Sequence, residues 1–163
     1  MTAIVFDQEG TFAEWQAIDD RVMGGISSSH MRFHPDGHAV FEGEMSLAQG
    51  GGFASVRTQS NALQATGIHS YLIDLCGDGK RYKLSLRTDT RFDGITYQAE
   101  FAAPAGQWAT IQLPVAAFVP RFRGRALPDA PAFAPAAVCQ VGLMIADKQA
   151  GPFALGIRSI RCI

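Results

Sequence analysis

Residues 30–43 read HMRFHPDGHAVFEG, and this stretch decides the fold class. The Pro-Asp-Gly sequence at 35–37 is a turn signal between two runs that alternate apolar and polar residues, which predicts a β-hairpin. If the histidines on either side of the turn face each other, Met31 lies opposite Phe41 on one face, because side chains alternate along a strand. One polar and one apolar face per strand is typical of an antiparallel sheet.

The same alternation recurs along the chain, between joints rich in glycine and aspartate. In RYKLSLR (81–87) the apolar side chains point one way and the polar ones the other, and TYQAEF (96–101) repeats the pattern. Further strands are expected in FASVRT (53–58), SYLIDLC (70–76), ATIQLP (109–114), QVGLMIAD (140–147) and FALGIRSIRC (153–162). We therefore predict an all-β fold of roughly ten strands, an antiparallel two-sheet jelly-roll sandwich.

Composition limits the class of protein. The 163 residues fit one domain, 1–163, and the net charge of −1 argues against nucleic-acid binding. Three widely spaced cysteines indicate neither a disulfide framework nor a zinc site. The start, MTAIVFDQEG, is not a signal peptide, and no apolar run is long enough for a membrane span. We expect a cytoplasmic protein with no metal and no cofactor.

One segment breaks the strand pattern. Residues 114–137 contain five prolines, which exclude a central strand and a long helix. We expect a long Pro-rich loop there, and its phenylalanines indicate that it packs on the sandwich. Structureless loops of this length in a compact domain are usually functional or disordered.

The stretch DDRVMGGISSS at 19–29 raises the question of a phosphate-binding loop. Glycine-rich turns bind phosphate when their amides converge at a helix N-terminus, but here a strand follows, and neither a Walker motif nor GxGxxG is present. The favoured interpretation is a bend in which Asp20 and Ser27 bind neighbouring backbone.

No catalytic constellation stands out. His30 and His34 are about 13 Å apart along one strand, so they cannot share a metal ion. No GxSxG elbow is present, and the carboxylate pairs at 19–20 and at Glu42 and Glu44 are common by chance. Catalytic residues are therefore not assigned, and a hydrolase using Asp or Glu is the least favoured hypothesis.

Arginine supplies eleven of the fourteen basic residues, which favours planar, bidentate contacts. Arg57 and Arg87 fall on the polar sides of their strands, and Gln98 on a later strand is expected to approach Arg87. The sequence RFRGR at 121–125 reads as an extended segment with Arg121, Arg123 and Arg125 on one side and Phe122 on the other. These arginines either form a face for a polar ligand or a partner's carboxylates, or make ordinary surface ion pairs.

With these residues in hand, the chain resembles the complex I intermediate-associated protein family. The resemblance rests on Trp15 and on DDRVMGGISS, AVFEGEMSLAQGGGFASVRT, GDGKRYKLSLRTD, YQAEF, GQWATIQLP, FVPRFRGR and VGLMIADKQAGPFALGIRSI, in this order from 19 to 160. It implies a galactose-binding-like β-sandwich, and eukaryotic members that assist assembly of mitochondrial NADH:ubiquinone oxidoreductase. No established catalytic residues come with it.

The resemblance also adds candidate residues. Its motif positions include Asp20, Arg57, Arg87, Gln98, Trp108 and Arg125, which form either a structural polar network or a recognition surface. The chain has no Arg/Ser-rich amphipathic start of the mitochondrial type, so we expect a stand-alone, bacterial-type member.

Together these observations predict a non-enzymatic, assembly-factor-like protein. It would recognise a protein partner, such as a respiratory-complex intermediate, through an arginine-bearing sheet face and the 114–137 segment. The alternative is a carbohydrate-binding module that uses the same face, although the expected inward orientation of Tyr82 and Tyr97 leaves few aromatic platforms for a sugar.

Overall fold

The hairpin predicted at 30–43 is present in the computed structural model, which describes residues 2–8, 14–20, 25–48 and 52–163. Strand β3 (Ser28–His34) pairs antiparallel with β4 (His38–Met45). The register places Met31 opposite Phe41 and the two turn-flanking histidines opposite each other, as predicted.

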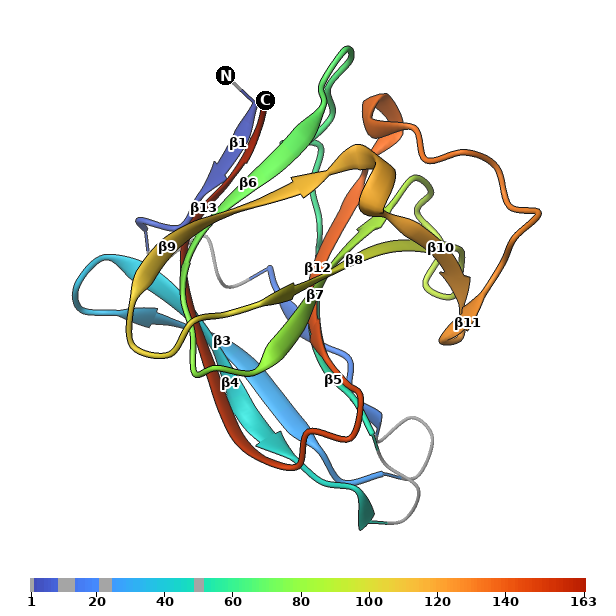
Figure 1. The fold of residues 1–163 in the computed structure, drawn as a ribbon. Helices are drawn as coiled ribbons and strands as arrows, with labels where there is room; N and C mark the ends of the chain where they lie inside the picture. Colours follow the sequence, from blue (N-terminus) through green and yellow to red (C-terminus); the bar gives the residue numbers. More distant parts are fainter. Residues whose placement is uncertain (1, 9–13, 21–24, 49–51) are drawn as a thin grey trace.

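The described strands form two antiparallel sheets that face each other (Figure 1). The six-stranded sheet has the order β3-β4-β13-β6-β9, and β1 also pairs with β13. Its remaining members are β1 (Ala3–Val5), β6 (Ser70–Cys76), β9 (Trp108–Pro114) and β13 (Gly151–Cys162). The seven-stranded sheet has the order β11-β10-β8-β7-β12-β5-β2. Its members are β2 (Gln16–Ala17), β5 (Ala54–Gln59), β7 (Arg81–Arg87), β8 (Thr96–Ala102), β10 (Val119–Phe122), β11 (Arg125–Ala126) and β12 (Gln140–Ile145). The predicted all-β, antiparallel two-sheet jelly-roll sandwich is confirmed.

The hydrophobic core lies between the two sheets. On β7, Tyr82, Leu84 and Leu86 are fully buried, as their alternation predicted. The Tyr82 ring packs against Phe41 and Phe153 of the opposite sheet, with centroids 6.2 and 6.4 Å apart. Aromatic contacts therefore join the two layers at the centre, where each buried side chain contributes roughly 1.5–3 kcal/mol.

The Pro-rich segment 114–137 contains short regular elements. It holds the 3-10 turns η4 (Val115–Ala117) and η5 (Pro135–Ala137) and, between them, the hairpin of β10 and β11 at the edge of the seven-stranded sheet. Pro120 lies within β10, opposite Tyr97 of β8. Proline is tolerated there because the two-residue strand β11 pairs only with Arg121 and Phe122, so that no ladder hydrogen bond on that side requires an N–H from residue 120.

The prediction that RFRGR is extended was wrong. Arg123 and Gly124 form a two-residue turn, with φ angles of 51° and 80°, and Phe122 pairs with Arg125 across it. Two consecutive left-handed residues produce the tight hairpin turn that matches the twist of the flanking strands. The three arginines therefore do not share one side of a single strand.

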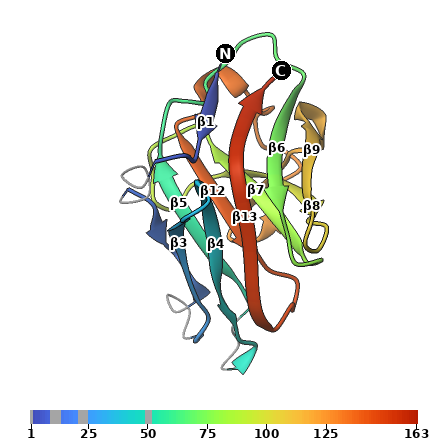
Figure 2. The ribbon, with the colours of Figure 1, turned by 90° about the vertical axis from the view of Figure 1, so that its left-hand side faces the viewer.

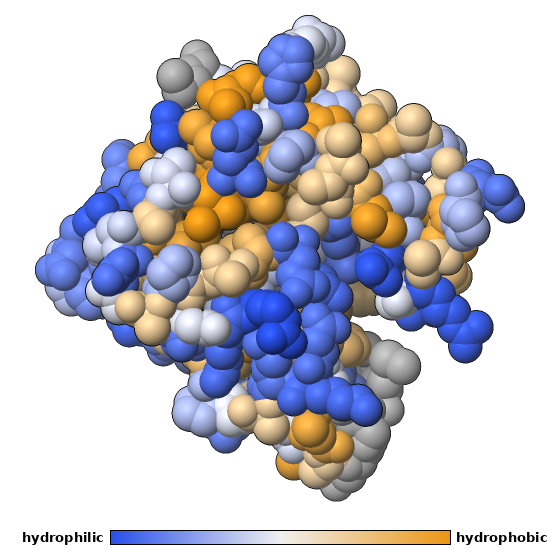
Figure 3. Space-filling model, viewed as in Figure 1, coloured by the Kyte–Doolittle hydropathy of each residue, from blue (hydrophilic) through white to orange (hydrophobic). Residues whose placement is uncertain are grey.

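Figures 2 and 3 show two sides of the molecule. Figure 2 looks onto the six-stranded sheet, and both termini lie at the same end of it. On the face seen in Figure 3, apolar residues gather in the upper part and hydrophilic residues across the centre. No helix in the described part of the chain is long and apolar enough to cross a membrane.

Candidate recognition face

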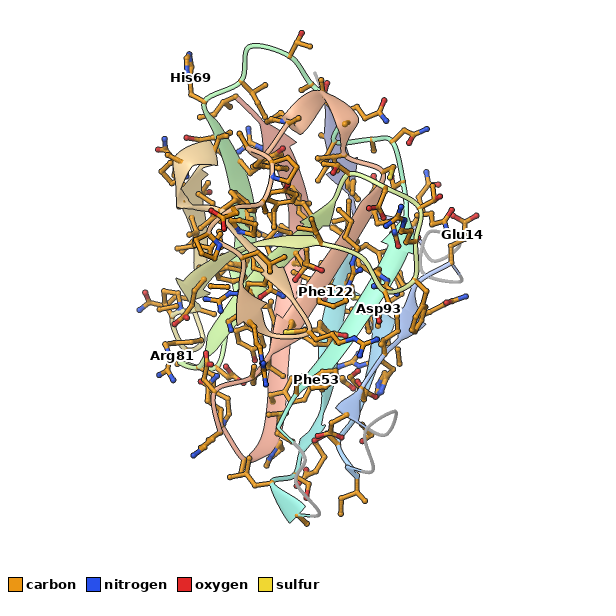
Figure 4. The ribbon with its side chains drawn as sticks, turned by 90° about the vertical axis from the view of Figure 1, so that its right-hand side faces the viewer. Glu14, Phe53, His69, Arg81, Asp93 and Phe122 are labelled. Atoms are coloured by element: carbon orange, nitrogen blue, oxygen red, sulfur yellow. The ribbon has the colours of Figure 1, made fainter. Side chains whose placement is uncertain are left out.

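The outer face of the seven-stranded sheet carries three of the predicted residues. Arg57 lies on β5, Arg87 on β7 and Gln98 on β8, and β12 runs between β5 and β7. Figure 4 looks onto this side of the molecule, with Phe122 and Asp93 over the middle of the sheet and Glu14 at one edge. We call this surface the recognition face.

Arg57 and Arg87 meet at one backbone carbonyl. The oxygen of Phe92 accepts a hydrogen bond from Arg57 Nη2 at 3.1 Å and one from Arg87 Nη1 at 3.3 Å. Arg87 Nη1 also donates to the oxygen of Gly94 at 3.2 Å. The two guanidinium groups thus hold the loop between β7 and β8 against the sheet.

A residue that the sequence analysis missed completes this anchor. Gln140 on β12 is buried, and its Nε2 donates to the backbone oxygens of Asp89 and Arg91, at 2.7 and 3.0 Å. Gln140 begins the sequence QVGLMI, which predicts an apolar strand. Nothing in this pattern indicates which backbone groups the Gln140 side chain binds. Three side chains from three strands therefore fix the backbone of residues 89–94.

The aromatic ring of the anchored loop points outward. Phe92 is 64% exposed, and the Arg57 guanidinium lies 4.9 Å from its ring centroid. A second pair of this kind lies on the β10–β11 hairpin, where the guanidinium of Arg123 is 5.2 Å from the ring centroid of Phe122. Exposed rings stacked on guanidinium groups are therefore present at two places on the rim of the recognition face.

An ion pair links the two rim segments. Arg123 donates from both Nε and Nη2 to Asp93 Oδ2, at 3.0 and 2.6 Å. Asp93 belongs to the β7–β8 loop and Arg123 to the hairpin turn, so the pair joins the loop to the hairpin. Arg125 is exposed and makes no ion pair within the described residues.

Partial burial lowers the pKa of both Arg57 and Arg87. Desolvation, followed by repulsion from Arg57, lowers the pKa of Arg87 to about 10. Desolvation also lowers the pKa of Arg57, against a smaller raising effect of Asp93. Arg87 stays charged at neutral pH, and Asp89 and Asp93 of the β7–β8 loop partly offset the lowering of its pKa.

Gln98 does not approach Arg87 as predicted. Its Nε2 donates to Ser85 Oγ at 3.0 Å and contacts Met144 Sδ at 3.6 Å. The register explains this difference, because Ser85 is the direct partner of Gln98 and Arg87 lies two residues further along β7. Gln98 is part of the floor of the face and only 8% exposed.

Asp20 and Ser27 form a separate network at the start of the sandwich. Asp20 Oδ2 accepts hydrogen bonds from Ser27 Oγ at 2.6 Å and from the amides of Gly52 and Phe53, at 2.8 and 3.3 Å. Its Oδ1 accepts the amide of Ser27 at 2.9 Å. The bond between Asp20 and Ser27 agrees with the favoured interpretation, and the bonds to Gly52 and Phe53 add a long-range tie between the backbone before β3 and the backbone before β5. The part of that stretch from 21 to 24 lies outside the described residues.

The same network sets the charge of Asp20 and the identity of a neighbouring residue. Burial alone would raise the pKa of Asp20, but the hydrogen bonds from Ser27, Gly52 and Phe53 outweigh it and lower the pKa. A Cβ atom at Gly25 would lie 2.5 Å from the Asp20 carboxyl carbon. Gly25 therefore makes room for Asp20, and this stretch is a structural joint away from the recognition face.

A comparison with known families decides the relationship. A sequence profile of the family described as Complex I intermediate-associated protein 30 (CIA30) matches residues 4–157. The chain belongs to the CIA30 family. A protein of Schizosaccharomyces pombe described as uncharacterised is 26% identical over 185 residues, which cover 98% of this chain and 83% of the yeast protein.

Solved structures similar to this CIA30-family chain include carbohydrate-binding modules. The family 11 module of the cellulosomal cellulase Lic26A-Cel5E of Clostridium thermocellum superimposes with a TM-score of 0.70 at 12% identity, covering 99% of this chain and 95% of the module. A family 29 module superimposes with a TM-score of 0.55 at 11% identity, covering 99% and 85%. At these identities the likeness shows the fold alone, and it confirms the galactose-binding-like sandwich.

Trp108, one of the CIA30 motif residues, is not on the recognition face. It lies on β9 of the six-stranded sheet, where the Arg158 guanidinium is 3.7 Å from its ring centroid and His38 packs against its edge at 4.9 Å. The sequence could not assign a sheet to Trp108, because that depends on β9 pairing with β6. Arg158 covers one face of this ring.

The remaining polar clusters of the CIA30-family chain are engaged in local contacts. Asp19 accepts hydrogen bonds from Ser29 and from the amide of Ser55, and Glu42 pairs with Arg32 and His30. In the parts of the chain that the structure describes, no group of three or more His, Cys, Asp or Glu residues could hold a metal ion.

Proposed function

We propose that this chain is a non-catalytic binding protein whose recognition face docks a protein partner, in the manner of an assembly factor. One observation carries the proposal: the rim of one sheet face presents the exposed rings of Phe92 and Phe122, each stacked with an arginine. Aromatic residues and arginine are the types that protein interfaces concentrate at their energetic centres.

The construction of the face supports docking. Arg57, Arg87 and Gln140 hold the β7–β8 loop from below, and the Arg123–Asp93 pair holds it from the side. A surface fixed before binding loses little conformational entropy when a partner arrives. Membership of the CIA30 family supports intermediates of NADH:ubiquinone oxidoreductase as the class of partner.

The proposal is tested by quantitative affinity capture from the native organism. Wild-type protein is expected to retain subunits of NADH:ubiquinone oxidoreductase, and Phe92→Ala and Arg57→Ala are expected to lower their recovery about tenfold or more. Arg32→Ala is the matched control, because Arg32 is an exposed arginine on β3 of the other sheet. Equal recovery by all four proteins, or no recovery of these subunits, would contradict the proposal.

Carbohydrate binding on the same face is the second candidate, favoured by the carbohydrate-binding modules among the structural neighbours. The aromatic rings of this face favour carbohydrate binding less than protein binding. Tyr82 and Tyr97 are buried, and arginines already stack on Phe92 and Phe122. A glycan array discriminates the two functions: binding that Phe92→Ala abolishes supports the sugar, and an array without a signal removes it.

A further inference from the structure

A cavity of about 290 Å³ opens beside the anchored β7–β8 loop. Its walls combine one guanidinium group, three side-chain amides, threonine residues, a phenyl ring and one carboxylate. They consist of Glu14, Gln16, Arg57, Thr58, Gln59, Thr90, Phe92 and Gln140. This lining is rich in hydrogen-bond donors, and the volume suits one long polar side chain or a small ligand.

Arg57 forms no ion pair with an acid of the described residues, although Asp93 acts on its charge from a longer distance. Within the described residues, Arg57 uses only Nη2, which donates to the neutral backbone oxygen of Phe92. Arg87 also donates to this oxygen, so two guanidinium groups share one carbonyl and no carboxylate pairs with either. Because Arg57 is desolvated and lines the cavity, an anion bound there would be stabilised by its charge.

The nearby acids leave room for such an anion. Asp93 is engaged through Oδ2, which accepts both hydrogen bonds from Arg123, the shorter at 2.6 Å. Asp89 Oδ1 accepts the amide of Arg91 at 3.0 Å. Glu14 is exposed at the edge of the face in Figure 4 and makes no ion pair in the described part of the chain. Its charge opposes an incoming anion.

We propose that this cavity binds the carboxylate of an acidic side chain, presented by the protein partner, through one edge of the Arg57 guanidinium group, formed by the second hydrogen of Nη2 and the adjacent Nε or Nη1 group. The inference rests on the proposed function and names the chemistry of the partner's docking segment. A planar guanidinium group matches a carboxylate with two parallel hydrogen bonds, and the side-chain amides of Gln16 and Gln59 bind the adjoining peptide groups. Because Arg57 stacks on Phe92, a sugar ring has less of that ring surface to pack on.

The test is an NMR titration of the folded protein. The probe is the blocked tripeptide acetyl-Gly-Glu-Gly-amide, and acetyl-Gly-Gln-Gly-amide is the uncharged control. The glutamate peptide is expected to shift the Nε resonance of Arg57 and the side-chain amides of Gln59 and Gln140 at millimolar concentrations. The glutamine peptide is expected to bind at least tenfold more weakly, since it cannot form the charged pair.

Variants assign the site. Arg57→Ala is expected to abolish the shifts at Gln59 and Gln140, and Arg32→Ala to leave them unchanged. Glu14→Gln is expected to tighten binding roughly two- to threefold, because it removes an opposing exposed charge. Glu14 is exposed, so this variant is expected to fold normally and keeps the inference testable if Arg57→Ala does not fold.

Three results would overturn the inference. The first is equal binding of the two peptides, and the second is binding that survives Arg57→Ala with no effect of Glu14→Gln. The third is binding of sodium glucuronate but not of the glutamate peptide, which would assign the cavity to a sugar acid. Partner capture that is lost in Phe92→Ala while the glutamate peptide gives no shift rejects the carboxylate site alone and leaves the proposed function standing.

Discussion

Asp19 and Asp20 are adjacent in the chain, yet they bind different parts of the sandwich. Asp19 accepts bonds from Ser29 in β3 and from the amide of Ser55 in β5, and Asp20 accepts them from Ser27 and from the residues before β5. A single pair of carboxylates thereby joins strands of both sheets. Buried acids of this kind stabilise a fold only when their hydrogen bonds are complete.

Asp20→Asn is expected to lower the free energy of unfolding by roughly 2–4 kcal/mol at pH 7, because an amide nitrogen would face backbone and hydroxyl donors. The pKa of Asp20 is lowered from its ordinary 3.8, so its contribution is complete above about pH 4 and lost as the pH falls through the folded-state value. The deficit of the variant should therefore shrink in acid.

Urea denaturation of both proteins at pH 7, 5, 4 and 3 measures this dependence. Asp129→Asn is the control, since Asp129 is exposed and should change stability by less than about 0.5 kcal/mol. A variant as stable as the wild type at pH 7 would show that the Asp20 network contributes little.

Removing the hydroxyl groups of two buried tyrosines is expected to change stability in different ways. The Tyr71 hydroxyl has no hydrogen-bond partner among the described residues, whereas the Tyr82 hydroxyl donates to Asp78 Oδ2 at 2.9 Å. Tyr71→Phe is therefore expected to leave stability unchanged or raise it by about 1 kcal/mol, and Tyr82→Phe to lower it by roughly 1–2 kcal/mol. Thermal unfolding measures both, and a larger loss from Tyr71→Phe would reveal a partner for its hydroxyl.

At the scale of elements, the β7–β8 loop depends on side chains from three strands. Arg57, Arg87 and Gln140 donate to four of its backbone oxygens, those of residues 89, 91, 92 and 94. Backbone oxygens in a loop have no ladder partners, so these side chains replace the hydrogen bonds of regular structure. The position of Phe92 follows from this anchoring.

Arg87→Met is expected to release the loop without unfolding the sandwich. Losing the bonds to residues 92 and 94 should cost about 1.4 kcal/mol locally, which raises hydrogen-exchange rates of amides 89–95 roughly tenfold. Residue-resolved exchange measures this change, with Arg32→Met as the control on the opposite sheet. Unchanged exchange in this segment would mean that Arg57 and Gln140 hold the loop alone.

The elements also show what the sequence could predict. Alternation located β7 and β8 and the inward side of each, because burial of Tyr82 or Tyr97 on one face follows from the two-residue period of a strand. It also placed Arg87 on the polar side of β7, whereas the face that Arg87 shares with Arg57 depends on β12 pairing with both β5 and β7. It did not predict the partner of Arg123, because Asp93 is thirty residues away and the contact requires an arginine in a left-handed turn.

At the scale of the molecule, the two outer faces of one sandwich differ in the role of their arginines. On the six-stranded sheet, Arg158 covers Trp108, and Arg32 pairs with Glu42. On the seven-stranded sheet, Arg57 and Arg87 bind neutral carbonyls and keep their charge unpaired within the described residues. Two other arginines of the seven-stranded sheet do pair with acids, Arg81 with Glu100 and Arg123 with Asp93. The charges of Arg57 and Arg87 on this face are therefore open to a partner's acid.

The core and the recognition face use different residues. We therefore expect one phenylalanine to affect mainly the stability of the fold and another to affect mainly binding of the partner. Phe41 is fully buried and packs on Tyr82 and Phe153. Phe41→Ala is therefore expected to lower the free energy of unfolding by roughly 3–5 kcal/mol. The two sheets share this core, so we expect them to unfold in one transition. Phe92 is 64% exposed, so Phe92→Ala should cost less than about 1 kcal/mol and yet lose partner capture.

Urea denaturation and quantitative capture on the same two preparations decide this question. Capture by the Phe41→Ala variant, measured at a temperature where it remains folded, should equal that of the wild type, because the recognition face is built on the other sheet from β4. A Phe92→Ala variant that binds normally, or a Phe41→Ala variant that is folded but fails to bind, would place recognition elsewhere. The separation follows from the architecture: the core sets the distance between the sheets, and the residues that hold the β7–β8 loop face away from that core.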